Sequence, residues 1–267
     1  MRNRLEVSSM SKNTPSEPGL VLLMFCCALF SLSVIGVGHA QHEGEPHAGL
    51  HGAPVIGHDH QGSEASPAVW EGSTAGIAYS EQNHQIAGWA VILMGLAEVS
   101  HVMRVQSLMW ARLLLPLAMF FVGIFLMVWS DHEAWPVGHL SFAETFFGQD
   151  YEIVQHKFFG LLALAVGSVE LFRRLGRAGH AAWATPLPLM AIIVGIMLFG
   201  HSHGIHPSAH KIAVHHAVMG TIAVTAGSSK LFSGWRHPVT GPAGSKWEWL
   251  WAGFLLLIGA QLLIYSE

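Results

Sequence analysis

Long apolar blocks separated by short polar connections fill most of the chain. Each block is about 20 residues long, which is the length that a helix needs to cross the hydrocarbon core of a bilayer. Alternating strand patterns are absent, and an isolated strand would leave its backbone unsatisfied in lipid. We therefore predict an all-α, polytopic transmembrane helix bundle. Its six expected spans cover residues 84–103, 109–129, 153–172, 184–200, 212–232 and 247–265.

The first apolar block differs from the other six. Basic residues, Arg2, Arg4 and Lys12, precede the apolar run 20–38, which ends in small residues. This order is typical of a cleaved signal peptide, so we predict a signal over residues 1–40, with an uncleaved anchor as the alternative. Cys26 and Cys27 both lie inside it. The mature chain would then hold no thiolate for catalysis, disulfides or metal binding.

A polar segment, residues 41–82, follows the signal. It is rich in Gly, Ala, Ser, Pro, Glu and His and contains no Lys or Arg, so we predict a disordered, His-rich leader. Its five histidines alternate with acidic residues, a composition that suits low-specificity metal capture; a merely solvated acidic tail is the alternative. They are His42, His47, His51, His58 and His60. Residues 83–267 form the predicted six-helix domain.

Basic residues sort the connections between spans into two classes. The first, third and fifth connections and their edges hold Arg104, Arg112, Arg173, Arg174, Arg177, Lys230, Arg236 and Lys246. The second and fourth hold only Lys157 and Lys211, each at the mouth of a span. Since short loops rich in Lys and Arg stay in the cytoplasm, both ends of the mature chain are predicted to lie on the opposite side.

Histidines gather on that opposite side. The chain has 19 histidines, and only His101, His180 and His237 fall on the predicted cytoplasmic side. Neutral imidazole binds copper, zinc and nickel, and it is the strongest metal ligand available to a chain without cysteine. The distribution indicates that the outer face handles a transition metal.

A subset of these histidines begins or ends apolar spans, where a polar ring is costly unless it has a partner or a function. The subset comprises His84, His156, His201, His203, His215 and His216. Four helices thus present histidine at a similar depth, and in a bundle these side chains can converge on one metal site. The alternative is that each ring caps a helix or bonds a neighbouring carbonyl.

Three further residues are candidates for the same site. Met197 precedes His201 by four residues and Met219 follows His216 by three, so each shares a helical face with a histidine. Thioether with imidazole favours Cu(I), although methionine also serves simple packing. Asp131 is a candidate partner that fixes an imidazole tautomer, or an ordinary loop charge.

Four short motifs give the chain a resemblance to a known family. They are residues 130–136 (SDHEAWP), residues 155–157 (QHK), residues 201–203 (HSH), and His216 with Gly220. In this order they resemble the copper-resistance D (CopD-like) membrane domain, over about residues 84–235. The resemblance implies a bacterial inner-membrane protein for copper uptake or tolerance that works with periplasmic copper carriers. His132 stands where that family has proline, and the motif after His216 also lacks its proline.

Copper uptake, handling or resistance is accordingly the first functional hypothesis, with the copper ion, the lipid bilayer and a periplasmic copper carrier as expected partners. The alternative is a membrane b-type cytochrome with one His-ligated haem near the periplasmic face. Zinc-protease, nucleophile-elbow and phosphate-loop motifs are absent, so we expect no enzyme activity. The net charge of −4 gives no support to nucleic-acid binding.

Overall fold

The computed structural model describes residues 72–104, 106–201, 208–236 and 245–267. The predicted signal peptide, most of the predicted leader with its histidines, and His203 lie outside these residues. All regular structure in the described residues is helical, which confirms the predicted all-α class.

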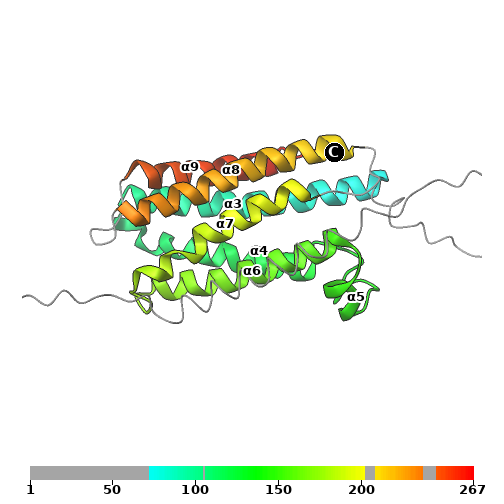
Figure 1. The fold of residues 1–267 in the computed structure, drawn as a ribbon, viewed down its shortest axis with the longest axis horizontal. Coiled ribbons are helices and arrows are strands. Elements are labelled where there is room, and N and C mark those ends of the chain that lie inside the picture. Colours follow the sequence, from blue (N-terminus) through cyan, green and yellow to red (C-terminus); the bar gives the residue numbers. More distant parts are fainter. Residues whose placement is uncertain (1–71, 105, 202–207, 237–244) are drawn as a thin grey trace, which may run out of the picture.

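Six long helices correspond to the six predicted spans (Figure 1). They are α3 (Thr74–Val102), α4 (Leu114–Val128), α6 (Tyr151–Arg174), α7 (Pro186–Met197), α8 (Ala209–Arg236) and α9 (Lys246–Leu263). A 3-10 helix, Gln106–Leu113, precedes α4, and two more, Ala181–Ala184 and Leu198–Gly200, flank α7. The short helix α5 (Phe142–Phe147) lies in the connection between α4 and α6.

Four helical segments are long and apolar enough to cross a membrane. They are Thr74–Val102, Trp110–Val128, Tyr151–Arg174 and Ala181–Gly200. Helices α8 and α9 fall short because polar residues interrupt their apolar surface, including His215, His216, Ser228 and Ser229 on α8, and Lys246, Glu248 and Gln261 on α9. The structure therefore shows four candidate spans in its described part, and the six predicted spans are not confirmed.

Helix α3 begins earlier than the predicted first span, so the last part of the predicted leader, from Thr74 to Gln82, is helical. The side chain of Ser73 caps the helix by accepting a hydrogen bond from the Gly76 amide at 3.1 Å. The hydroxyl of Tyr79 donates to the Trp129 carbonyl at 2.5 Å. One local bond and one bond to the end of α4 thus hold the first turns of α3, which hydropathy alone did not reveal.

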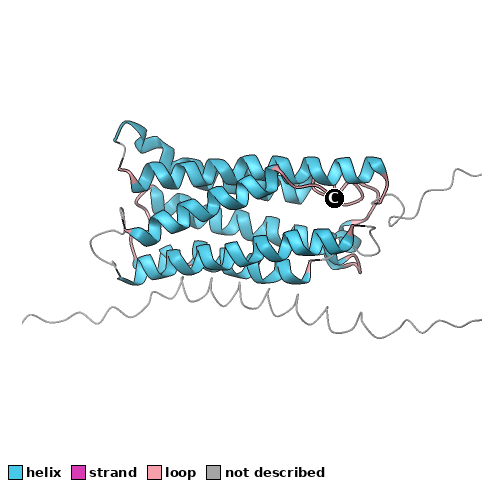
Figure 2. Cartoon of the chain, turned by 90° about the horizontal axis from the view of Figure 1, so that it is seen from above, coloured by secondary structure: helices cyan, strands magenta, loops and turns pink. Residues whose placement is uncertain are grey.

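The helices pack in three pairs, α3 with α9, α4 with α6, and α7 with α8, and run nearly parallel to one axis (Figures 1 and 2). Glycines allow close approach within the pairs. In the α7–α8 pair, a Cβ atom on Gly220 would lie 2.5 Å from the carbonyl oxygen of Gly195. The two backbones touch at this point, as is common where membrane helices cross.

Polar side chains are concentrated at the two ends of the bundle, with an apolar core between them that includes Leu115, Met119, Leu162 and Val166. We call the end that contains His84, His156, His201 and His216 the histidine end. The opposite end, which contains Glu98, Glu170, Arg174 and Lys230, is the arginine end. Successive long helices alternate in direction, so the start of α3 and the C-terminus of the chain both lie at the histidine end (Figure 1).

Candidate metal centre

Four imidazole rings from four different elements form a continuous cluster at the histidine end. The ring centroids of His156 on α6 and His201 after α7 lie 5.4 Å apart. The His201 ring meets the edge of the His216 ring of α8 at 4.6 Å, and His84 of α3 lies 5.9 Å from His216. His201 and His216 are buried. The structure thus brings together histidines that are separated by more than a hundred residues in sequence.

Three of these rings have Nδ1 held by an oxygen that only accepts hydrogen bonds. His156 Nδ1 lies 2.7 Å from Asp131 Oδ1, and His84 Nδ1 lies 2.8 Å from the Ser80 carbonyl. His201 Nδ1 bonds Gln155 Oε1. Nδ1 must therefore donate in each pair, which leaves the lone pair of the neutral ring on Nε2. Metal-binding histidines characteristically show this arrangement, because the bond from Nδ1 orients the ring.

The orientation of the Gln155 amide follows from its second contact. Its Nε2 donates to the carbonyl of Met197 at 3.2 Å, so its oxygen must face His201. Gln155 is almost fully buried at 1% exposure, and a buried amide is stable only when its polar atoms have partners. The residue before His156 on α6 therefore fixes the ring at the end of α7.

Asp131 supports His156 as an ionised carboxylate. Lys157 Nζ lies 2.7 Å from Asp131 Oδ2, and the Ser130 hydroxyl donates to the same oxygen at 2.5 Å. Burial by itself would raise the pKa of the Asp131 carboxyl, but the charge of Lys157 and the hydrogen bonds from His156 and Lys157 hold this pKa below its usual range. Asp131 can therefore accept the proton on His156 Nδ1 as a hydrogen bond throughout the physiological pH range.

Glu152, His156 and His201 form a group whose potential ligand atoms all lie within 4.8 Å of one another. Glu152 precedes His156 by four residues on α6, which places both side chains on one face of the helix. Two ligands that each lie about 2.0–2.1 Å from a shared ion are at most about 4.2 Å apart, so a small rotation of these side chains suffices to bind one ion. A carboxylate and two imidazoles are a normal ligand set for Cu(II) or Zn(II).

Tyr265, just after α9, closes the cluster on the side of His84. Its ring stacks on His84 at 3.8 Å and meets the edge of the His215 ring at 5.5 Å. His215 Nδ1 is buried and has no hydrogen-bond partner among the described residues. His215 thus lies next to the cluster, on a different face of α8 from His216.

The predicted site residues fall into three groups in the structure. His84, His156, His201 and His216 come together, and Asp131 lies behind His156. Met197 and Met219 are buried; Met197 belongs to the apolar core, and its backbone carbonyl binds Gln155. His215 is adjacent to the cluster through Tyr265.

The sequence interpretation missed Glu152, Gln155 and Tyr265 as parts of this region. The four-residue spacing from Glu152 to His156 was a usable signal for a shared helix face. Gln155 appeared only as part of the QHK motif, without a role, and Tyr265 gave no signal, since their contacts come from α7, α3 and α8, which are remote in sequence.

A second polar cluster, the ion-pair network of the arginine end, joins four helices. The Glu98 carboxylate of α3 contacts Arg174 at 2.5 Å and Lys230 at 3.0 Å, and it accepts a hydrogen bond from the Trp251 indole at 2.8 Å. Lys230 also contacts Glu248 at 2.5 Å. Glu170 completes the network by pairing with Arg173 and Arg174. Three acidic and three basic side chains thus compensate one another.

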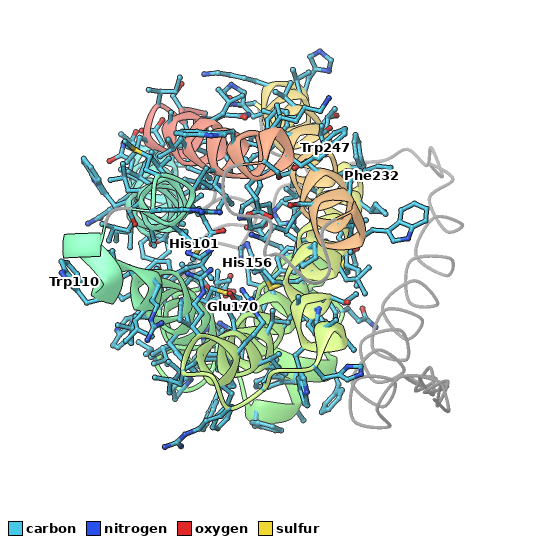
Figure 3. All side chains as sticks on the ribbon, turned by 90° about the vertical axis from the view of Figure 1, so that its left-hand side faces the viewer. His101, Trp110, His156, Glu170, Phe232 and Trp247 are labelled. Carbon is cyan, nitrogen blue, oxygen red and sulfur yellow. The ribbon has the colours of Figure 1, made fainter. Side chains whose placement is uncertain are left out.

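A view along the bundle from the arginine end shows how these clusters lie relative to the surface (Figure 3). His156 and Glu170, both on α6, lie toward the interior of the ring of helices, whereas Trp110 lies on the outside. Phe232 and Trp247 stack at 5.4 Å at the periphery. The side chains of His156 and Glu170 therefore lie inside the bundle, whereas Trp110, Phe232 and Trp247 lie at its surface.

Comparison of the chain with protein-family models, with curated proteins and with solved structures finds no match.

Proposed function

We propose that the chain is a bacterial inner-membrane protein that binds copper at Glu152, His156 and His201, and that it serves copper uptake, handling or resistance. His84 and His216 complete the histidine cluster around these ligands. The observation that carries the proposal is the set of three imidazoles whose Nδ1 atoms are held by Asp131, Gln155 and Ser80. Such fixed rings with Nε2 lone pairs are the arrangement that a metal ion requires.

Copper is the favoured ion because nitrogen and oxygen sites bind Cu(II) more tightly than the other divalent first-row metals. Imidazole also suits Cu(I), for which thioethers such as those of Met197 and Met219 are additional ligands. The Glu152 carboxylate favours Cu(II). The resemblance of residues 130–136, 155–157 and His216 with Gly220 to the CopD-like domain supports the same metal.

The proposed topology has six spans, with the histidine end in the periplasm. Most of the basic residues of the connections, including Arg112, Arg174 and Arg177, belong to the arginine end, and positive connections are retained in the cytoplasm. Two buried charges of α8 and α9 at the arginine end, Lys230 and Glu248, pair with each other, and Lys230 also contacts Glu98. Compensated charges inside a bundle are compatible with a membrane span. Both termini of the mature chain are then periplasmic, where a soluble copper carrier can reach the site.

The test is metal analysis and absorption spectroscopy of the purified, detergent-solubilised protein, before and after Cu(I) is added under reducing conditions. We expect one tightly bound copper per chain, lost in His156→Ala and in His201→Ala. His139→Ala, which removes an exposed histidine of the α4–α6 connection, is the matched control and should bind copper as the unchanged protein does. Copper bound equally by all variants would show that the ion binds elsewhere; an intense Soret band that shifts on reduction would replace copper with haem b.

A further inference from the structure

A cavity of about 140 Å³ lies beside the metal centre at the histidine end. Its walls come from the first turns of α3, the end of α4, the connection after α4 and the start of α6. It contacts both His84 and His156, which belong to the histidine cluster, and also Glu152. The cavity therefore reaches the proposed ligands from the side of α3 and α4, opposite to α7.

The cavity wall is strongly acidic. Among the described residues it contains no Lys or Arg, and its carboxylates are Asp131, Glu133, Asp150, Glu152 and Glu267. Lys157 pairs with Asp131 from behind, so the negative charge that remains comes from the other four. Asp150 is exposed, whereas Glu152 and Glu133 are half-buried, so the carboxylates extend from the surface inward.

A space of this size has room for several water molecules, and the carboxylates in its wall can hold them by hydrogen bonds. An acidic, water-filled cleft between apolar walls concentrates cations and speeds their association by about 10–10³-fold. Because the innermost groups, Glu152 and His156, are two of the proposed ligands, a cation that enters exchanges water for protein ligands without crossing an apolar barrier.

We propose that this cavity is the access route by which a hydrated metal cation reaches the metal centre from the outer solution. The proposal rests on the proposed function, and it adds the path and the kind of species that travels on it: a free or weakly chelated cation rather than an anionic complex.

Two variants test the route in different ways. Ala87→Phe places a ring in the cavity wall, one turn of α3 after His84 and on a different helix from Glu152 and His156. A plug in a path slows loading and release of copper by the same factor, so we expect both rates to fall about tenfold while the affinity is unchanged. Glu133→Gln with Asp150→Asn removes two charges, and Asn still caps α6. We expect about tenfold slower loading at low salt and a smaller difference at high salt.

The measurement is rapid mixing of the metal-free protein with aqueous Cu(II), and then of the loaded protein with an excess of chelator. Glu144→Gln is the control: it removes one charge from α5, outside the cavity, and Gln retains the capping box with Ser141. Absence of copper binding in the unchanged protein would overturn the proposed function itself. Normal binding with unchanged rates in Ala87→Phe and in the charge variant would overturn the access route alone.

Discussion

Gly220 of α8 faces the backbone of Gly195 of α7 so closely that a Cβ atom on Gly220 would lie 2.5 Å from the Gly195 carbonyl oxygen. On α8, Gly220 lies about one turn after His216. On α7, Gly195 lies shortly before His201, which follows that helix. The contact therefore sets the distance between the two buried rings, whose centroids are 4.6 Å apart.

Gly220→Ala should for this reason weaken both the bundle and the site. The added methyl group has to push α7 and α8 apart, and overpacking of this kind costs about 1–3 kcal/mol of stability. We expect a lower unfolding temperature in detergent and a lower copper affinity. Gly253→Ala on α9 is the control, because its Cβ would meet no atom within 4 Å. Equal behaviour of the two variants would show that the α7–α8 contact does not determine the site.

Asp131→Asn tests whether the carboxylate acts on the metal through His156. Removal of such a partner of a metal-binding histidine costs about 10–100-fold in affinity. The single change also leaves Lys157 without its acidic partner in a buried position, which destabilises the protein. The double variant Asp131→Asn with Lys157→Met removes that unpaired charge.

Copper affinity and thermal unfolding, measured side by side on both variants, separate the two effects. If Asp131 orients His156, the double variant should recover stability but keep the weakened affinity. Recovery of both properties together would mean that Asp131 matters only for packing. Glu144→Gln is a suitable charge control here too, since Glu144 lies on the exposed helix α5.

The positions of the long helices could be predicted from sequence because apolar runs of membrane length are a local signal. Each predicted span overlaps a helix, and the largest discrepancy is at α3, whose first turns are held by Ser73 and Tyr79 rather than by apolar burial. Whether α8 and α9 cross a membrane is harder to predict. Buried charges on these helices pair with residues on other helices, as Lys230 does with Glu98. Such pairs cannot be found from the hydropathy of one helix alone.

The site was predictable in part for a similar reason. His84, His156, His201 and His216 stood out because imidazoles at the ends of apolar spans are costly without a partner. Because these four rings lie at a similar depth in their helices, the sequence also indicated that they meet at one site. The contribution of Glu152 depends on the end of α7 reaching the first turn of α6, and the role of Gln155 depends on a bond to the Met197 carbonyl. Both relationships are tertiary.

Lys230→Met should destabilise the arginine end without affecting the metal centre. Lys230 Nζ lies 3.0 Å from Glu98 and 2.5 Å from Glu248, and both carboxylates are almost fully buried. Removing one partner of a buried ion pair costs about 3–5 kcal/mol, because the other charge stays behind uncompensated. Lys246→Met, at an exposed position at the start of α9, is the control and should change stability little.

Thermal unfolding in detergent and the number of copper ions bound by the folded protein at low temperature are the two measurements for this pair. We expect the unfolding temperature to fall only in Lys230→Met, with one copper bound in both variants. Loss of copper from folded Lys230→Met would show that the two ends of the bundle are coupled, contrary to this expectation.

The proposed six-span topology predicts which side of the membrane each connection faces. In a background with Cys26→Ser and Cys27→Ser, single cysteines can be placed at exposed positions and exposed to a membrane-impermeant maleimide in intact cells. His139→Cys, in the α4–α6 connection at the histidine end, should be labelled directly. Gly179→Cys, before α7 at the arginine end, should be labelled only after the membrane is permeabilised.

Lys246→Cys at the start of α9 distinguishes six spans from four. If α8 and α9 both cross, this residue is cytoplasmic and reacts only after permeabilisation, as Gly179→Cys does. If only the four most apolar segments cross, the chain after α7 stays outside, and Lys246→Cys is labelled in intact cells. The second result would also be incompatible with the contact of Lys230 with Glu98, because α3, which carries Glu98, is one of the four segments that would still cross.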